Sequence, residues 1–300
     1  MVNLINLDIA GINFAIDYPD SFILQETDPV YQEFLKKVGS RRNTSDIEIH
    51  VTLDKIPNTS KMKKIFDSNR SWLMFTDKQK YFIKVRGPRM DKEPVWVAKI
   101  NHNFNKVNVY CNEKFAVKNG DSYTVSNPIR YPLDQLLLMY NLADKQGVLI
   151  HAAGIGINGK GFIFAGRSGA GKSTLVRQFI DQKKFKLLSD DRIVIRTIDH
   201  AFSAFGTPWP GDAGIAMNNS VLLHGIFFIF HGAANQLREV SPQAALEYLL
   251  PVISVPWYDR EMTDKILSFC EDLVENIPAY ELYFKPGDEI VDFLARSVQL

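Results

Sequence analysis

The feature that most constrains this chain is a glycine-rich stretch near its middle, Gly166-Arg167-Ser168-Gly169-Ala170-Gly171-Lys172-Ser173-Thr174. It matches the pattern G-x-x-x-x-G-K-[ST] at every fixed position. The glycines allow the backbone to turn tightly and to point its N–H groups inward, which forms a cradle for anions. In such a loop the lysine reaches the terminal phosphates and the serine hydroxyl binds a magnesium ion. The stretch therefore predicts a nucleoside triphosphate site, with ATP and Mg²⁺ as the cofactors.

The residues on either side of this loop support that interpretation. Residues 162–165 form a short apolar run typical of a buried strand, and residues 173–181 have helical spacing, with Leu175, Val176 and Phe179 on one face. A strand, a glycine loop and a helix N-terminus in this order bring backbone donors to a phosphate. The alternative is a glycine-rich turn that binds nothing, and the lysine, the serine and the flanking elements argue against it.

The strand before the loop is expected to pair with the segment that precedes it. Asn158-Gly159 separates two apolar runs, residues 148–157 and 161–165, and Asn-Gly between apolar runs is a strong signal for a β-hairpin. The hairpin puts the strand that carries His151 beside the strand of the loop. His151 then either reaches the terminal phosphate or is an ordinary core histidine, and the spacing alone leaves both open.

A pair of carboxylates follows the next apolar run, in Asp190-Asp191-Arg192. Residues 186–189 are expected to form a strand that crosses over to a parallel neighbour of the loop strand, so that the acids reach the phosphates. Ser173 and Asp190 are the expected magnesium ligands, and Asp191 the group that accepts a proton from an incoming hydroxyl. The opposite assignment of the two acids stays open, as does the simpler reading of a turn with surface ion pairs.

Negative charge that develops on a transferred phosphoryl group also calls for an arginine. Arg167, Arg192 and Arg238 are the candidates, and the sequence does not rank them.

The pattern of the chain predicts an α/β (α+β) protein in two parts. Residues 1–126 alternate in the manner of strands and turns and predict a β-rich N-terminal domain without a chemical signature, which is expected to present or select the acceptor. Residues 127–300 contain the glycine loop and several helical stripes, including residues 260–276 and 288–298. A Gly/Pro-rich segment at 205–214 is longer than a plain connection needs, which is typical of a functional loop.

Composition excludes several classes of protein. The net charge of +1 gives no concentrated basic face of the kind that binds nucleic acid. The longest apolar block, residues 226–230, is too short to cross a membrane. Cys111 and Cys270 lie far apart, which favours reduced thiols and a cytoplasmic location. Whether the chain forms a homo-oligomer is left open.

Taken together, the run from His151, the loop from Gly166 to Thr174 and the segment Leu188-Ser-Asp-Asp-Arg resemble the catalytic domain of HPr kinase/phosphorylase. They are more similar still to the HPr-kinase-related proteins linked to peptide modification. The resemblance covers about residues 131–284. It implies a P-loop kinase domain in a mixed, strongly bent sheet, the fold shared with nucleotide-dependent phosphoenolpyruvate carboxykinases. It also implies transfer of phosphate from ATP to a serine hydroxyl, with catalytic roles for His151, Lys172, Ser173, Asp190 and Asp191.

The expected function is an ATP- and Mg-dependent kinase that phosphorylates a hydroxyl, most simply a serine, on a protein, a peptide or a small molecule. The downstream signature and arginine loop of true HPr kinases have no match in this chain, so the acceptor is left open. Two alternatives remain. One is a regulatory protein that senses a nucleotide without turning it over, and the other is a carboxykinase-like enzyme.

Overall fold

The structure is a computed structural model of the chain, and it describes residues 2–25, 29–36, 45–87, 93–180, 182, 184–287 and 289–297. The chain divides into two compact units, Met1–Asn141 and Leu142–Leu300. Asp181, Asp288 and Val298, the expected ends of two helices, lie outside the described residues.

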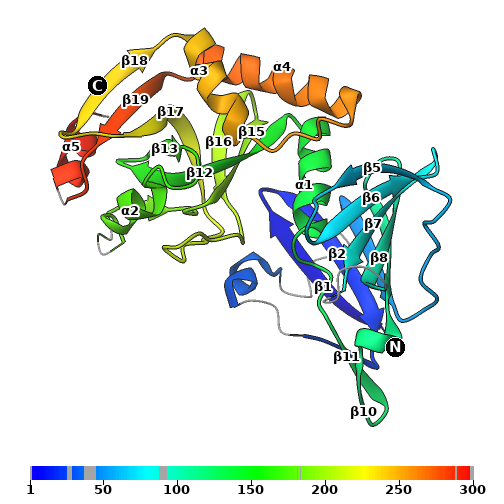
Figure 1. Cartoon of the computed structure of the whole chain (residues 1–300). Helices are drawn as coiled ribbons and strands as arrows, with labels where there is room; N and C mark the ends of the chain where they lie inside the picture. The colour runs from blue at the N-terminus through cyan, green and yellow to red at the C-terminus, as the bar shows by residue number, and fades with distance from the viewer. Residues whose placement is uncertain are drawn as a thin grey trace. The chain divides into compact units, whose positions relative to one another are not determined.

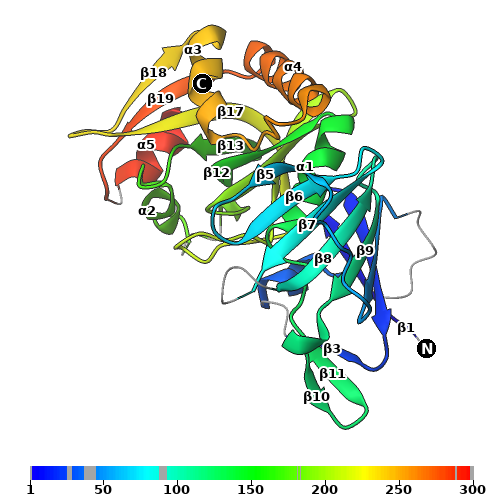
Figure 2. The same cartoon turned by 45° about the vertical axis from the view of Figure 1, so that its right-hand side comes forward.

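The first unit consists almost entirely of strands within its described residues. Its larger sheet has eight strands in the order β1-β2-β4-β9-β8-β7-β6-β5, several of which lie side by side in Figure 2. Their bounds are β1 Val2–Ile9, β2 Ile12–Pro19, β4 Ile47–Thr52, β5 Lys63–Asp67, β6 Trp72–Thr76, β7 Lys80–Arg86, β8 Pro94–Asn101 and β9 Lys106–Cys111. The sheet is mixed, because β4 runs parallel to both β2 and β9. Ile47, Ile49 and Val51 of β4 are buried, as their alternation with polar residues predicts.

A smaller three-stranded sheet has the order β10-β11-β3. The remaining elements of this unit are β3 Phe22–Leu24, the 3₁₀ turn η1 Pro29–Phe34, the 3₁₀ turn η2 Glu113–Phe115, β10 Val117–Asn119 and β11 Ser122–Val125.

The boundary between the units falls after Asn141, whereas the change of sequence character suggested residue 126. The physical reason is helix α1, Leu133–Asp144, which contacts the turn between β8 and β9 and the 3₁₀ turn η1. The ring of Tyr140 stacks on Phe104, and Asn141 Nδ2 donates a hydrogen bond of 3.0 Å to the Phe104 carbonyl. The Tyr31 hydroxyl donates to the buried carboxylate of Asp134. Residues 133–141 of this apolar helix thus belong to the strand-rich unit.

The second unit contains another eight-stranded sheet, in the order β13-β12-β15-β16-β17-β19-β18, with β14 beside β12. Its strands are β12 Gly147–Ile157, β13 Lys160–Ala165, β14 Lys186–Leu187, β15 Arg192–Ile198, β16 Ala201–Gly206, β17 Ser220–His231, β18 Gln236–Val240 and β19 Ala279–Phe284. β17 pairs antiparallel with β16 near its start and parallel with β13 further along. The path β13-β12-β15-β16-β17 therefore closes on itself, which forces the sheet to bend. The expectation of a mixed α/β fold with a mixed sheet is confirmed.

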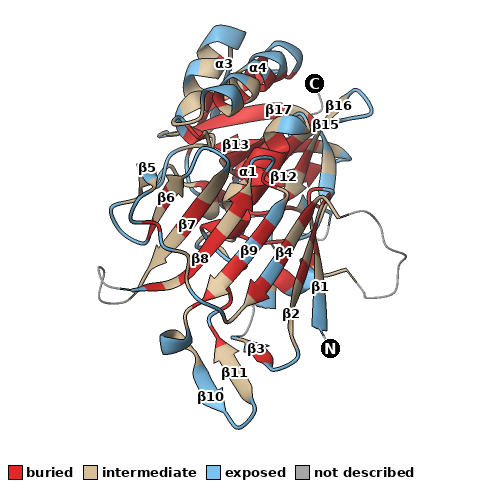
Figure 3. Cartoon of the chain, turned by 90° about the vertical axis from the view of Figure 1, so that its right-hand side faces the viewer, coloured by how far each residue is buried: buried red, intermediate tan, exposed pale blue. Residues whose placement is uncertain are grey.

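Helices cover both faces of this sheet (Figure 1). They are α2 Lys172–Arg177, α3 Pro242–Leu249, the 3₁₀ turn η3 Leu250–Val252, α4 Arg260–Asn276 and α5 Glu289–Ser297. α2 and α5 share one core with alternate residues of the strands, including Phe164, Phe227 and Phe284. Phe228 and Phe230 point to the opposite face and contact Tyr248 of α3. Figure 3 shows the buried strands of this sheet beneath α3 and α4, whose outer faces are exposed.

The predicted hairpin before the glycine loop is confirmed. β12 and β13 pair antiparallel from Ala152 with Ala165 to Ile157 with Lys160. Asn158 and Gly159 turn the chain with φ values of 50° and 80°, the left-handed geometry of a two-residue hairpin turn.

The expected path of the next strand is wrong in one respect. β14 does not lie beside β13, because it pairs antiparallel with β12, through Ile155 with Leu187. The parallel neighbour of β13 is instead β17, about sixty residues further along the chain. The two acids after β14 therefore approach across β12, the strand that carries His151.

No helix within the described residues combines the length and the apolar character that crossing a membrane requires.

Candidate functional site

The glycine loop joins the carboxyl end of β13 to the first turn of α2. Gly169 and Gly171 have φ values of 84° and 100°, a backbone geometry that favours glycine and that side-chain-bearing residues rarely adopt. Gly171 is the N-cap of α2 and no side chain caps this helix end. Leu175, Val176 and Phe179 anchor the segment, since all three are fully buried in the core below. The predicted strand, loop and helix are present, although α2 ends at Arg177 and continues only as turns to residue 180.

The side chain of Lys172 folds back onto the glycine loop. Its side chain is buried, and Nζ donates hydrogen bonds of 2.9 and 3.3 Å to the carbonyls of Gly166 and Arg167. Burial lowers the pKa of Lys172 below its usual value, and the nearby charge of Asp191 opposes that shift. A buried ammonium group that has only neutral carbonyl partners gains from an anionic one.

Asp191 forms the centre of a small charged cluster with His151 and Arg192. Its Oδ1 is 2.7 Å from His151 Nε2, and its Oδ2 is 3.3 Å from Arg192 Nε. Burial raises the pKa of Asp191. The hydrogen bond from His151 and the charges of His151, Arg192 and Lys172 lower it by more than burial raises it, so the net shift of the pKa is downward. An ionised carboxylate only accepts hydrogen bonds, so the proton of this pair is on His151 Nε2.

Asp190 is in a different environment, although it is the adjacent residue. Its side chain is fully buried and accepts three backbone hydrogen bonds. Gly211 N and Ile215 N donate to Oδ1 at 2.8 and 3.1 Å, and Ala213 N donates to Oδ2 at 2.8 Å. This carboxylate therefore holds the segment around residues 211–215 rather than facing the open space beside the loop.

A cavity of about 250 Å³ brings the expected groups together. It is lined by His151, Ser168, Gly169, Gly171, Lys172, Ser173, Thr174, Arg177, Asp191, Gly211 and Asp212. The structure thus gathers His151, Lys172, Ser173 and Asp191 around one space. Asp190, although predicted with them, does not line it.

The three arginine candidates separate clearly. Arg192 contacts the lining residue Asp191 but does not itself line the cavity. Arg167 is exposed and lines a neighbouring cavity on the α3 side of the loop. Arg238 is on β18 with its side chain 76% exposed and 3.9 Å from Glu281, outside the cavity.

Sequence reasoning missed Arg177, Gly211 and Asp212 as cavity residues. Arg177 could have been found, because it follows Ser173 by four residues and therefore lies on the same side of α2. Gly211 and Asp212 belong to the Gly/Pro-rich segment that was recognised as unusual, but no local signal ties that segment to Asp190.

The oxygen donors that line this cavity fit a magnesium ion. Within the described ranges, no group of three or more His, Cys, Asp or Glu side chains gathers in the manner of a metal cage. Magnesium needs only one or two protein oxygens when phosphates and water supply the rest of its octahedron. The Ser173 hydroxyl and the carboxylates at this cavity are ligands of that kind.

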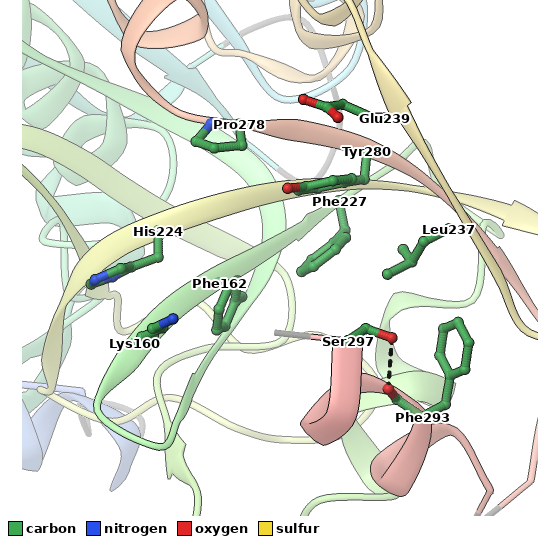
Figure 4. A pocket seen from close by; sticks show the side chains of 10 residues that line it. All are labelled: Lys160, Phe162, His224, Phe227, Leu237, Glu239, Pro278, Tyr280, Phe293 and Ser297. Atoms are coloured by element: carbon green, nitrogen blue, oxygen red, sulfur yellow. Dashed lines mark hydrogen bonds between the residues drawn. The ribbon is translucent and has the colours of Figure 1, made fainter. Parts of the chain in front are cut away.

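Two other cavities of this unit differ in character. The one beside Arg167, about 370 Å³, has walls formed by Phe228, Phe230 and Tyr248. The other, about 470 Å³, is bounded by Phe162 and Tyr280 among others and is shown in Figure 4. It lies at the opposite end of β13 from the glycine loop, since Lys160 at the start of that strand lines it.

No curated protein matches the chain. The solved structure of the Hpr(Ser) kinase/phosphatase from Coxiella burnetii is similar at 15% sequence identity, with a TM-score of 0.31 over 50% of this chain and 95% of that chain. A match to the family described as SynChlorMet cassette protein ScmC extends over residues 134–285. Because this match spans half of the chain, the protein belongs to the ScmC family of SynChlorMet cassette proteins.

Proposed function

We propose that this protein is an ATP- and Mg-dependent kinase that transfers the γ-phosphate to a hydroxyl group, such as a serine, of a peptide, a protein or a small molecule. The observation that carries the proposal is the shared cavity. A lysine ammonium, a serine hydroxyl and a histidine-paired carboxylate line the same space as the glycine loop. Each of these groups has a role in phosphoryl transfer.

In the proposed site the loop amides and Lys172 bind the phosphates. The Lys172 ammonium exchanges its carbonyl partners for phosphate oxygens, which are stronger acceptors. The Ser173 hydroxyl would hold a magnesium ion there, and that ion would neutralise part of the phosphate charge. Arg192 is close enough to Asp191 to hold that carboxylate in place through its guanidinium.

Asp191 is the residue proposed to meet the acceptor. Its lowered pKa keeps it ionised at neutral pH, so it can accept the hydrogen bond of an incoming hydroxyl and orient the oxygen toward phosphorus. The new bond joins the acceptor oxygen to the γ-phosphorus, the bond from γ-phosphorus to the bridging oxygen breaks, and ADP leaves. The acceptor proton passes to Asp191, and the hydrogen bond from His151 Nε2 keeps that carboxylate oriented.

The test measures nucleotide binding and turnover separately. A fluorescent ATP analogue gives the dissociation constant, and ADP release is followed with free serine, serine-containing peptides and HPr as acceptors. We expect Lys172→Met to weaken nucleotide binding by at least about tenfold, because it removes a charged phosphate contact. We expect Asp191→Asn to leave binding within about threefold of wild type and to lower acceptor-dependent ADP release by about 10²- to 10⁴-fold.

Lys106→Met is the matched control for the lysine variant, because Lys106 of β9 is exposed and is not part of the cavity lining. Absence of nucleotide binding by the wild-type chain would overturn the proposal. Stoichiometric binding without ADP release for any acceptor would instead identify a nucleotide sensor, the alternative that this cavity also allows.

A further inference from the structure

Residues 207–215, the 207–215 loop, have no role in the chemistry described so far, yet they are tied closely to the acid segment. Thr207 Oγ1 donates a hydrogen bond of 2.7 Å to the Arg192 carbonyl. Ser189 Oγ donates at 3.4 Å to the carbonyl of Trp209. Together with the three bonds to Asp190, these contacts attach the loop along most of its length. The loop is therefore a fixed wall of the cavity.

The attachment makes Asp190 unsuitable as a metal ligand. A carboxylate has about four acceptor sites, and three of those on Asp190 are taken by N–H groups. The side chain is also completely buried. To reach an ion in the cavity, Asp190 would have to release the loop and leave three buried donors without a partner, which is costly.

The same attachment fixes the backbone of another acidic residue at the cavity. The donors to Asp190 belong to Gly211, Ala213 and Ile215, so Asp212 lies among them but is not engaged by Asp190. Gly211 approaches so closely that a Cβ there would be 2.8 Å from Asp190 Oδ2. Gly211 and Asp212 both line the cavity, and the Asp212 side chain is exposed and makes no ion pair with a described residue.

Asp212 is also on the side of the cavity where the metal is expected. Arg177 Nη2 donates to the Asp212 carbonyl. Arg177 is four residues after Ser173, so the two project from the same side of α2. The loop therefore crosses α2 beside the turn that carries the Ser173 hydroxyl.

We propose that Asp212, not Asp190, is the carboxylate ligand of the divalent cation that binds with the nucleotide, and that Asp190 is a positioning residue that holds Asp212 in place. This inference rests on the proposed function, because it needs a triphosphate in the glycine loop. Magnesium bound by Ser173, Asp212, phosphate oxygens and water has the ligand set that this ion prefers. Asp191, which contacts His151 and Arg192, then has no metal to bind and can accept the hydrogen bond of the acceptor hydroxyl.

The proposal predicts opposite effects with and without metal. A carboxylate that faces a triphosphate repels it unless a cation lies between them. In EDTA, Asp212→Asn should therefore bind the nucleotide as tightly as wild type or more tightly. In the complex with a non-hydrolysable ATP analogue, the same variant should bind Mn²⁺, measured by electron paramagnetic resonance, at least about tenfold more weakly, the scale of effect expected at a metal site.

Asp264→Asn is the control, because Asp264 is on the exposed surface of α4 and is absent from the cavity lining. A loss of Mn²⁺ affinity smaller than tenfold in Asp212→Asn overturns the inference. It is also overturned if Asp190→Asn alone loses Mn²⁺ while the 207–215 loop stays ordered in the metal-free protein. A wild-type chain that binds no nucleotide in either condition refutes the proposed function itself, which distinguishes that failure from the failure of this inference.

Discussion

Replacing Asp190 by asparagine tests the structural part of these conclusions without any ligand. The substitution keeps the shape of the side chain and removes its charge. Asparagine can keep the two hydrogen bonds that Oδ1 accepts from Gly211 and Ile215, but its NH₂ group then faces the N–H of Ala213. The NH₂ group of asparagine and the N–H of Ala213 are both hydrogen-bond donors, so the bond that Oδ2 now accepts would be lost.

The size of the effect follows from that contact. Losing one hydrogen bond to a charged group removes about 1.5–3 kcal/mol, and leaving a buried N–H without a partner costs about 1–3 kcal/mol. Removing the buried charge offsets part of this free-energy cost, because the variant no longer has to keep a carboxylate out of water. We therefore expect the loop to be destabilised by about 2–4 kcal/mol, with the larger values if the side chain cannot rotate.

Hydrogen exchange measured by mass spectrometry reports this opening directly. Amides that open locally exchange in proportion to the opening equilibrium, and a change of 2–4 kcal/mol corresponds to about 30- to 700-fold faster exchange. The amides of Gly211, Ala213 and Ile215 should show it in peptides that cover residues 207–217. Asp212→Asn is the control, because the Asp212 carboxylate makes none of these bonds, and its exchange should match wild type. If Asp190→Asn exchanges within about threefold of wild type, Asp190 does not hold the loop.

Two further predictions use the titration of side chains. Cys111 and Cys270 are buried, and burial raises the pKa of each to about 12, so neither thiol should react with a disulfide reagent at pH 8 until the chain is unfolded in urea; rapid reaction of a folded-state thiol would contradict this. The pKa of Asp191 lies below its ordinary value of 3.8, so its ionised form stabilises the fold above about pH 4, and that contribution is lost as the pH falls through the folded pKa. Urea midpoints from pH 7 down to pH 3 should therefore fall less steeply for Asp191→Asn than for wild type, and parallel curves would refute the assignment.

Local signals in the sequence predicted what local geometry decides. The hairpin turn at Asn158 and Gly159 needs residues that tolerate positive φ, and helix α4, Arg260–Asn276, follows the apolar stripe that predicts it. Both depend on neighbours within a few residues. The glycine loop is also a local feature, and its pattern predicted the strand before it and the helix after it.

The sequence did not predict in the same way which strands pair when they lie far apart along the chain. Nothing in the residues around β13 indicates that β17 is its parallel neighbour, because that contact joins segments about sixty residues apart. The difference between Asp190 and Asp191 is of the same kind. Two adjacent aspartates look equivalent in a sequence, and the amides that distinguish them come from residues more than twenty positions later.

That difference bears on how the proposed site balances its charge. A triphosphate brings several negative charges, and three free carboxylates around it would repel it strongly. In this chain backbone N–H groups surround Asp190, while His151 and Arg192 flank Asp191. Only Asp212 among the three lacks a compensating partner in the described residues, which leaves one free carboxylate for one magnesium ion. In the proposed site, the close packing of Gly211 against Asp190 has two effects. It keeps the Asp190 carboxylate paired with backbone N–H groups, where it repels a triphosphate less. It also holds the neighbouring Asp212 at the position where that residue is proposed to bind magnesium.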